Sequence, residues 1–298
     1  MKKVSVLIPI HNGIECTKKC LHELNGLFKT GEYTNCEFSI IVIDDGSSDG
    51  SKEWISANYP RVMILEGDGN LWWSGAVNKG AKHAFEGTGS DYVLLWNNDI
   101  KPKGNYFVIL SRIISQEPDS TIIGSKICNL NNNMIWSFGG IFNPKTGKKY
   151  MIGFNQTDSD KFNKVIEVDW LTGMGTLVSK KAVDRIGYWD RYNFPQYHGD
   201  SDFTYRAKLN GFKLKVFPEL VLYNDTSVTG YSHNYNMKRL FISFTNIKSK
   251  LNIRKNILFY RKYAKSPLAY LSLIILYFRA IGGFIKWNTL KLIGIKKI

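Results

Sequence analysis

Along the first hundred residues, short apolar runs rich in β-branched residues alternate with helix-forming stretches. Of all features of the sequence, this alternation restricts the possible folds the most. The apolar runs occupy residues 4–10, 38–43, 62–67 and 92–96. Helical stretches are expected at about 15–28 and 52–58, and again after a glycine-bearing loop that starts near residue 70. Strands that alternate with helices form a parallel sheet with right-handed crossovers. The sequence therefore predicts an α/β protein with a mostly parallel sheet flanked by helices.

Polar side chains follow two of these strands at the point where each strand ends. Asp44 and Asp45 follow the run 38–43, and Asn97, Asn98 and Asp99 follow the run 92–96. Asn and Asp also favour turns, so each cluster alone could be a simple turn. In open α/β sheets, however, ligands bind beyond the carboxyl ends of the strands. Two acidic clusters at the same edge of one sheet favour a binding site.

The content of apolar residues and cysteines narrows the class of protein. Hydrophobic residues make up 44% of the chain, which excludes a disordered protein. The four cysteines include no CxxC pair, which argues against a disulfide framework or a structural zinc site and favours a reducing cytosol. The opening "MKKVSVLIPI" is interrupted by Pro9 and lacks a small-residue cleavage site, so we interpret it as a strand and not as a signal peptide.

Positive charge is concentrated at the C-terminal end of the chain. No acidic residue follows Asp225, and residues 238–297 contain 14 of the 40 Lys and Arg, which leaves 26 basic and 25 acidic residues elsewhere. Because these basic residues are interleaved with apolar and aromatic ones, the tail resembles a surface for anionic lipid more than a nucleic-acid site. Arg279 and two glycines interrupt the apolar run, so we expect an interfacial amphipathic helix and not a membrane span. A helix packed on the main domain is the alternative.

The polar clusters suggest a particular chemistry. One carboxylate beside amides suits Mg²⁺ or Mn²⁺, which bind oxygen ligands together with substrate phosphates. A second acid, Asp200 in "HGDSDF", could accept a proton from an attacking hydroxyl, although a helix cap or a surface acid would explain it equally well. In this second region, strands are expected around 122–126, 135–143 and 175–178, helices near 180–185 and 202–209, and a surface loop at 155–164.

Six ordered motifs give the chain a resemblance to a known family. They are "VSVLIPIHNG", "IIVIDDGSSDGS", "GDGNLWWSGAVNKG", "LLWNNDI", "WLTGMGTLVSKKAVDRIGYWDRYNF" and "HGDSDFTYRAKLNGFKLKVFP", and they cover about residues 4–226. The set resembles family 2 glycosyltransferases, and within them the bacterial rhamnosyltransferase-like group. The resemblance implies a Rossmann-like GT-A fold over residues 1–235, with a nucleotide-binding half (1–120) and an acceptor-binding half (121–235). Residues 236–298 would form the membrane-associated region.

The resemblance also implies roles for individual residues. Asp200 would be the general base of an inverting enzyme, and Asp99 would bind the metal. The donor nucleotide sugar would contact Pro9, His11, Asp44, Asp45, Asn70, Gly75, Asn78 and Asn98. The acceptor would contact Trp170, Gly173, His198 and Asp202. Trp72 and Trp73 could either stack on a ligand or fill the gap between loop and sheet.

Two positions depart from the family pattern. Gly199 stands where the family usually has Glu, so part of the acceptor site is expected to differ. Asn224 and Asp225 stand where the family often has a metal-binding His, and His233 lies nine residues beyond Asn224. The requirement for a metal is therefore left open by the sequence.

The function implied is transfer of a sugar, with rhamnose as one candidate, from a dTDP- or UDP-linked donor to a saccharide or lipid-linked acceptor during bacterial surface polysaccharide synthesis. The enzyme would be cytoplasmic and peripheral on the inner face of the membrane, with no nucleic-acid partner. One alternative is a sugar-nucleotide nucleotidyltransferase, but "PIHNGIECTKK" lacks the glycine-rich basic loop expected after its first strand. A non-catalytic membrane-surface module is the other alternative, and the presence of Asp45, Asp99 and Asp200 argues against it.

Overall fold

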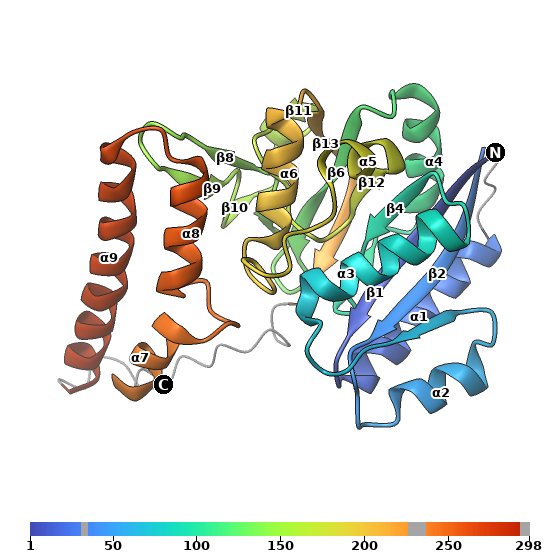
Figure 1. Cartoon of the computed structure of the whole chain (residues 1–298), viewed down its shortest axis with the longest axis horizontal. Coiled ribbons are helices and arrows are strands. Elements are labelled where there is room, and N and C mark those ends of the chain that lie inside the picture. Colours follow the sequence, from blue (N-terminus) through green and yellow to red (C-terminus); the bar gives the residue numbers. More distant parts are fainter. Residues whose placement is uncertain (31–34, 226–236, 293–298) are drawn as a thin grey trace.

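The computed structural model describes residues 1–30, 35–225 and 237–292 of the 298-residue chain. Its central feature is a large twisted sheet with helices on both faces, and three C-terminal helices lie to one side of it (Figure 1).

The N-terminal part of the sheet is parallel, as the alternation of strands and helices predicted. Its elements in chain order are β1 (Lys2–Ile10), α1 (Ile14–Thr30), β2 (Cys36–Asp44), α2 (Ser51–Asn58), β3 (Met63–Glu66), α3 (Trp72–Lys82) with a π-helical turn (η1, His83–Gly87), and β4 (Tyr92–Leu95). The strands lie in the order β3-β2-β1-β4, and the register pairs Ile10 with Asp44 and Leu7 with Leu95. The carboxyl ends of β1, β2 and β4 therefore meet at one edge of the sheet.

The second region adds antiparallel strands to this sheet. Its elements are β5 (Ile100–Pro102), α4 (Tyr106–Gln116), β6 (Thr121–Asn129), β7 (Met134–Ser137), β8 (Gly140–Phe142), β9 (Lys149–Met151), β10 (Gln156–Thr157), the 3-10 turn η2 (Asp160–Phe162), β11 (Ile166–Glu167), β12 (Thr176–Ser179), α5 (Lys180–Ile186), α6 (Gly199–Leu209) and β13 (Lys213–Asn224). β12 runs antiparallel between β4 and β6, whereas β8 and β9 form a separate hairpin.

The α/β class with a large sheet flanked by helices is confirmed, and two local expectations are wrong. Residues 155–164 are not only a surface loop, because they contain β10 and η2 and bury Phe162 against Phe138 at a ring-centroid distance of 5.7 Å. The helix expected at 202–209 begins at Gly199, one turn earlier, so that Asp200 lies in its first turn.

Two layers of apolar side chains hold the sheet between its helices. Successive strand residues point to opposite faces, so Val6 and Leu94 join one buried cluster while Leu7 and Val93 join the other. All four side chains are fully buried. Burial on both faces explains why these strands are continuous apolar runs without alternation.

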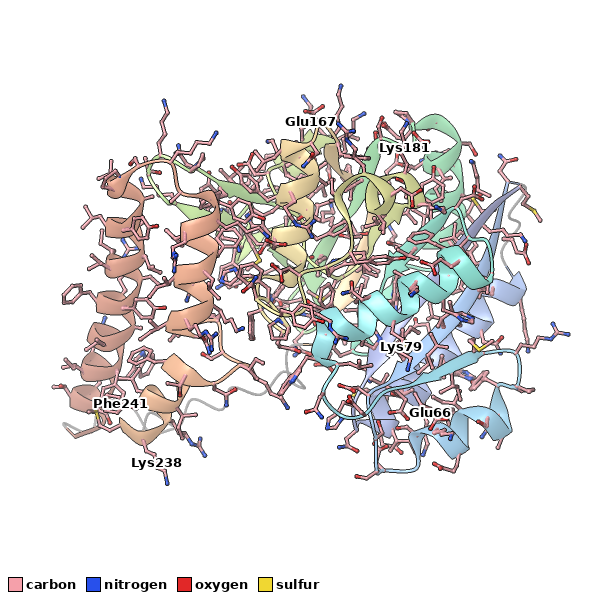
Figure 2. The ribbon with its side chains drawn as sticks, in the orientation of Figure 1. Glu66, Lys79, Glu167, Lys181, Lys238 and Phe241 are labelled. Carbon is pink, nitrogen blue, oxygen red and sulfur yellow. The ribbon has the colours of Figure 1, made fainter. Side chains whose placement is uncertain are left out.

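Three helices follow residue 236: α7 (Met237–Thr245), α8 (Ile253–Tyr263) and α9 (Pro267–Leu292). α8 packs on the second region through an aromatic cluster in which Phe259 lies 5.3 Å from Phe142 and Tyr263 lies 5.0 Å from Tyr205, centroid to centroid. By contrast, Lys238 and Phe241 project outward from α7 (Figure 2), and Phe241 is 61% exposed. The C-terminal helices are thus joined to the body through α8 and through the first half of α9, whose Ala269 and Leu273 belong to the same buried cluster.

The expected interruption of the C-terminal apolar run is wrong. Arg279, Gly282 and Gly283 all lie inside α9, which is one continuous helix of 26 residues. Two glycines cost only about 1 kcal/mol each relative to alanine in a helix, which a long apolar helix tolerates. Residues Pro267–Leu290 have a mean hydropathy of 1.9 and are long and apolar enough to cross a membrane, judged by length and composition only.

Candidate active site

A cavity of about 310 Å³ opens at the carboxyl ends of β1 and β2, beside the start of α3. This volume is at the lower end of the roughly 300–1,000 Å³ typical of small-molecule sites. The residues that line it are Pro9, Ile10, His11, Asp45, Gly69, Trp72, Trp73, Ala76, Gln196 and Lys248. Three of the predicted donor-binding residues, Pro9, His11 and Asp45, are among them.

Asp45 organises the loop that forms one wall of this cavity. Its Oδ1 accepts hydrogen bonds from the backbone N–H groups of Gly69 (2.9 Å) and Leu71 (3.1 Å), and its Oδ2 accepts one from Trp72 (2.9 Å). Gly67 must be a glycine, because a Cβ there would lie 2.5 Å from Asp45 Oδ1. His11 Nδ1 donates to the backbone carbonyl of Asp45 over 2.6 Å. The carboxylate thus fixes the entrance of α3, where backbone donors are otherwise unpaired.

Both tryptophans at the start of α3 line the cavity, and stacking of either ring on a ligand remains a prediction. Trp72 has a φ of +55°, a left-handed conformation that is unusual for a bulky residue. Trp73 also extends to the second region, since Cβ atoms at Gly173 and Gly199 would lie 2.2 and 3.4 Å from its ring. The two glycines therefore allow one aromatic ring to contact both halves of the sheet edge.

Five predicted donor-binding residues do not line the cavity; Asn98, described below, is one of them. Asn78 is bound in both directions to the backbone of Trp189, donating to its carbonyl (2.8 Å) and accepting from its N–H (2.9 Å). Asp44 is buried and accepts from the N–H of Ser47 over 2.8 Å. Gly75 lies against Leu71, and Asn70 stays in its own exposed loop. Their donor contacts remain predictions, and the geometry gives Asn78 and Asp44 structural roles.

Asp99 lies just beyond β4, in the segment that leads into β5. Its neighbour Asn98 donates from Nδ2 to Thr17 Oγ1 over 3.0 Å, which fixes the segment on α1. Asp225, after β13, lies opposite Asp99: its N–H contacts the Asp99 carbonyl at 3.3 Å. Burial raises the pKa of the Asp99 carboxyl, and the nearby Asp225 charge raises it further.

These two acids fit a hard divalent cation. Within the part of the chain that the structure describes, Asp99 Oδ1 is buried and has no hydrogen-bond partner. Two neighbouring carboxylates repel each other until a cation or a proton intervenes, and Mg²⁺ commonly takes one or two carboxylates plus substrate phosphates. The described residues contain no group of three or more His, Cys, Asp or Glu side chains that could hold an ion. A bound ion would therefore take its remaining ligands from water and a phosphate.

Asp200 lies in the first turn of α6. Its Oδ2 accepts from the N–H of Gly173 (3.1 Å) and its Oδ1 from the N–H of Ser201 (2.6 Å). Burial raises the pKa of this carboxyl, and the positive charge of Lys149 opposes the increase. A carboxylate with a raised pKa is a stronger proton acceptor than an exposed aspartate, which is what a general base requires.

Lys149 connects Asp200 to the C-terminal helices through a buried polar chain. Its Nζ donates to Ser201 Oγ (2.7 Å) and His198 Nδ1 (3.0 Å), and lies 4.4 Å from the Phe259 ring centroid. Burial lowers the pKa of Lys149 to about 8 and that of His198 well below its usual value. His198 is accordingly neutral and donates from Nε2 to Asn256 Oδ1 over 2.8 Å. Its predicted contact with the acceptor remains a prediction.

Asp202 has a different environment from Asp200, although it is only two residues away. Its side chain is fully buried. It binds Arg206 Nε (2.9 Å), Lys262 Nζ (2.6 Å) and the Tyr263 hydroxyl (2.6 Å). Both carboxylate oxygens are engaged by these groups and the side chain has no exposed surface, so the geometry supports a structural role for Asp202 more than the predicted acceptor contact.

The contacts around β4 bring Asp200 and Asp99 to the same edge of the sheet. The N–H of Gly175 donates to the carbonyl of Leu95 over 2.8 Å, four residues before Asp99. Gly173, two residues before Gly175, donates to Asp200. The segment just before β12 thus links the α6 carboxylate to the carboxyl end of β4.

Two polar residues of the cavity, Gln196 and Lys248, were not found from the sequence. Gln196 Oε1 accepts from the N–H of Trp73 over 3.2 Å, and Lys248 comes from the turn between α7 and α8. Lys248 lies outside the six motifs, and Gln196 lies in the short gap between the last two, so no pattern marked either residue.

Comparison with known proteins identifies a family for this chain. Residues 5–182 match the model of glycosyl transferase family 2. A hexosyltransferase of low-salt glycan biosynthesis, Agl10 of Haloferax volcanii, is 24% identical over 172 residues, 56% of this chain and 52% of that protein. The glycosyltransferase AglE of the same organism is 32% identical over 84 residues, 27% of this chain and 26% of that protein. The chain thus spans about half or less of the length of these relatives.

Solved structures show the same fold at low sequence identity. GalNAc-T7 with UDP, GalNAc and Mn²⁺ has a TM-score of 0.57 at 13% identity and covers 75% of this chain and 44% of its own. S. aureus TarS 1–349 in complex with UDP has a TM-score of 0.53 at 16% identity and covers 85% of this chain and 68% of its own. The predicted GT-A fold is confirmed, and the matched motifs and the family model together show that the chain belongs to glycosyl transferase family 2.

Proposed function

We propose that this glycosyltransferase moves a sugar from a nucleoside-diphosphate sugar to a hydroxyl of a saccharide acceptor, with inversion at the anomeric carbon. The position of Asp200 is the main support: its carboxylate lies at the edge of the sheet that also carries Asp99 and the cavity. The printed ligands of the structural neighbours, UDP, GalNAc and Mn²⁺, support the donor class and a divalent cation.

The residues of the chain suggest the following reaction. An oxygen of Asp200 removes the proton of the acceptor hydroxyl, and that hydroxyl oxygen attacks the anomeric carbon from the side opposite the nucleotide. The bond to the nucleoside diphosphate breaks through an oxocarbenium-like state, as in other glycosyl chemistry. The proton remains on Asp200 and the diphosphate leaves with the bonding electron pair. A divalent cation held by Asp99 and Asp225 would offset the negative charge of the departing diphosphate.

We also propose candidates for the sugar, its nucleotide carrier and the residues that contact the acceptor. Rhamnose is a candidate sugar because the "NLWWSG" segment resembles the rhamnosyltransferase-like group, and dTDP and UDP are the candidate carriers. Gly173, whose N–H donates to Asp200, and Trp170, three residues before Gly173, are proposed to contact the acceptor. The relation to glycan-biosynthesis enzymes supports a role in assembly of a surface polysaccharide on a lipid-linked acceptor.

A thermal-shift screen of dTDP-, UDP- and GDP-sugars, with and without Mn²⁺, tests the donor class. We expect a UDP- or dTDP-sugar to raise the unfolding midpoint, and more so with Mn²⁺. At a hundred times its dissociation constant a ligand adds about 2.7 kcal/mol of stability. Asp99→Asn should remove the Mn²⁺-dependent part only. No response to any nucleotide sugar would contradict the proposed donor, and retention of configuration in the product would contradict the single displacement.

We further propose that α9 lies on an anionic membrane and does not cross it. Three contacts hold its N-terminal half to the protein: Ser266, just before the helix, donates from Oγ to the Lys145 carbonyl (2.7 Å), Ser272 Oγ donates to the Thr146 carbonyl (2.6 Å), and the Tyr277 hydroxyl accepts from Asn256 Nδ2 of α8 (2.9 Å). A spanning helix would have to leave these partners. The residues at helical spacing on the uncovered side are Leu271, Ile275, Phe278 and Ile285, which are 39–70% exposed.

Co-sedimentation with vesicles tests this orientation. The double variant Leu271→Asp/Phe278→Asp should lose most of its binding to phosphatidylcholine vesicles that contain phosphatidylglycerol, because apolar burial and charge attraction act together at an interface. Val108→Asp, a matched change at another exposed apolar residue on α4, should bind like the parent. Release of the parent protein by carbonate would support an interfacial helix, whereas retention after carbonate would support a span.

A further inference from the structure

The wall of the cavity includes one residue from the C-terminal helices. Lys248 lies in the turn between α7 and α8, and Figure 1 shows this turn extending toward the start of α3. Its Nζ is 5.6 Å from the centroid of the Trp72 ring, which lines the same cavity. The two residues are 176 positions apart along the chain, so tertiary folding alone brings them together.

The turn that carries Lys248 is held by its own hydrogen bonds. Asn252 is buried and donates from Nδ2 to the carbonyls of Thr245 (2.8 Å) and Asn246 (3.1 Å), while its Oδ1 accepts from the N–H of Lys255 (3.0 Å). The Asn246 side chain accepts from the N–H of Lys248 over 2.7 Å. These bonds join the end of α7 to the start of α8 and fix the backbone at Lys248.

The charged residues that line the cavity indicate that the Lys248 ammonium group could bind an anionic part of a ligand. Among the described residues that line the cavity, Lys248 is the only Lys or Arg, and Asp45 is the only acid. Both oxygens of Asp45 already accept backbone N–H groups. A nucleoside diphosphate combines a flat aromatic base with a strongly anionic tail. Two indole rings and one ammonium group are suited to these two parts.

We infer that Lys248 binds a phosphate of the nucleoside-diphosphate donor, so that the turn between α7 and α8 completes the donor site. This inference rests on the proposed donor class. It also gives the C-terminal helices a second role besides the membrane: the region beyond residue 236 supplies part of the substrate site. A protein truncated before α7 would retain the family motifs and lose this cation.

The dissociation constants of UDP and of uridine, measured for the parent and for Lys248→Met, test the phosphate contact, because only UDP carries the diphosphate. Methionine keeps most of the apolar stem but removes the charge. We expect the dissociation constant of UDP to rise about tenfold, the order expected for loss of a charge-assisted hydrogen bond, and that of uridine to stay unchanged. Lys250→Met, two residues away in the same turn and also exposed, is the matched control and should bind both like the parent.

The outcomes separate this inference from the proposed function. If the parent binds UDP and Lys248→Met binds it equally well, the inference is wrong and the donor class stands. If the variant loses UDP and uridine alike, the residue supports the shape of the cavity and the phosphate contact is wrong. If the parent binds neither UDP nor dTDP, both the donor class and the inference fail.

Discussion

Asp200→Asn should reduce the turnover number by roughly 10²–10⁴-fold, the contribution usual for a general base, while the dissociation constant of the nucleotide donor changes little. Asparagine keeps the size of the side chain and one acceptor for the N–H of Gly173, but it cannot take a proton at neutral pH. Single-turnover transfer and UDP binding, measured on the same preparation, test the two parts. An active variant would contradict the role of Asp200 as base, and a variant that fails to fold would favour a helix-capping role.

The pH dependence gives an independent check of this residue. The base must be ionised to act, and burial raises the pKa of Asp200. Activity of the parent should therefore fall as the pH decreases through that raised pKa, at a higher pH than an exposed aspartate would require. Lys149 opposes the increase, and burial lowers the pKa of Lys149 to about 8. The Lys149 cation is accordingly present throughout the acidic limb and helps to keep Asp200 ionised there.

Asp202→Asn should lower the free energy of unfolding by about 3–5 kcal/mol, the usual cost of removing one partner from a buried ion pair. The change leaves Lys262 and Arg206 without their buried carboxylate, and it weakens the bond to the Tyr263 hydroxyl. Urea unfolding followed by circular dichroism measures the effect. Because Asp202 joins α6 to α8, the variant should also loosen the C-terminal helices from the body.

A surface ion pair provides the control for this stability change. Asp184→Asn breaks the exposed pair with Lys180, which lies in the same helix, and should change the free energy of unfolding by no more than about 0.5 kcal/mol. If Asp202→Asn were as stable as the parent but inactive, the acceptor contact expected from the sequence would be right and the structural role wrong.

The sequence predicted the parts of the fold that depend on local pattern. Buried parallel strands are largely apolar, so the polar residues that begin at Asp44 and Asn97 show approximately where β2 and β4 end. The antiparallel β12 was found as a strand, but its direction depends on pairing with Leu95 across the chain. The start of α6 at Gly199 was not predicted from the sequence. The helix starts there because His198, just before it, has a left-handed backbone conformation, and a histidine gives no sign of this in the sequence.

The sequence could predict those residues of the candidate site that lie at the ends of strands. Asp45, His11 and Pro9 reach the cavity because they end neighbouring strands. Lys248 and Lys149 could not be found in this way, since each acts through contacts with residues far away along the chain. Asp225 was noted only as a departure from the family, and its place opposite Asp99 depends on the pairing of β13 with β5. The residues missed by the sequence analysis are those whose position depends on contacts between distant parts of the chain.

The polar chain through Asn256 restricts how the protein can move on a membrane. The Asn256 amide binds Tyr277 of α9 on one side and His198, two residues before Asp200, on the other. If α9 lies on lipid as proposed, these bonds would restrict rotation of the body about α9 and hold Asp200 at a fixed distance from the headgroups. The enzyme would then favour acceptor hydroxyls that lie at this distance from the membrane.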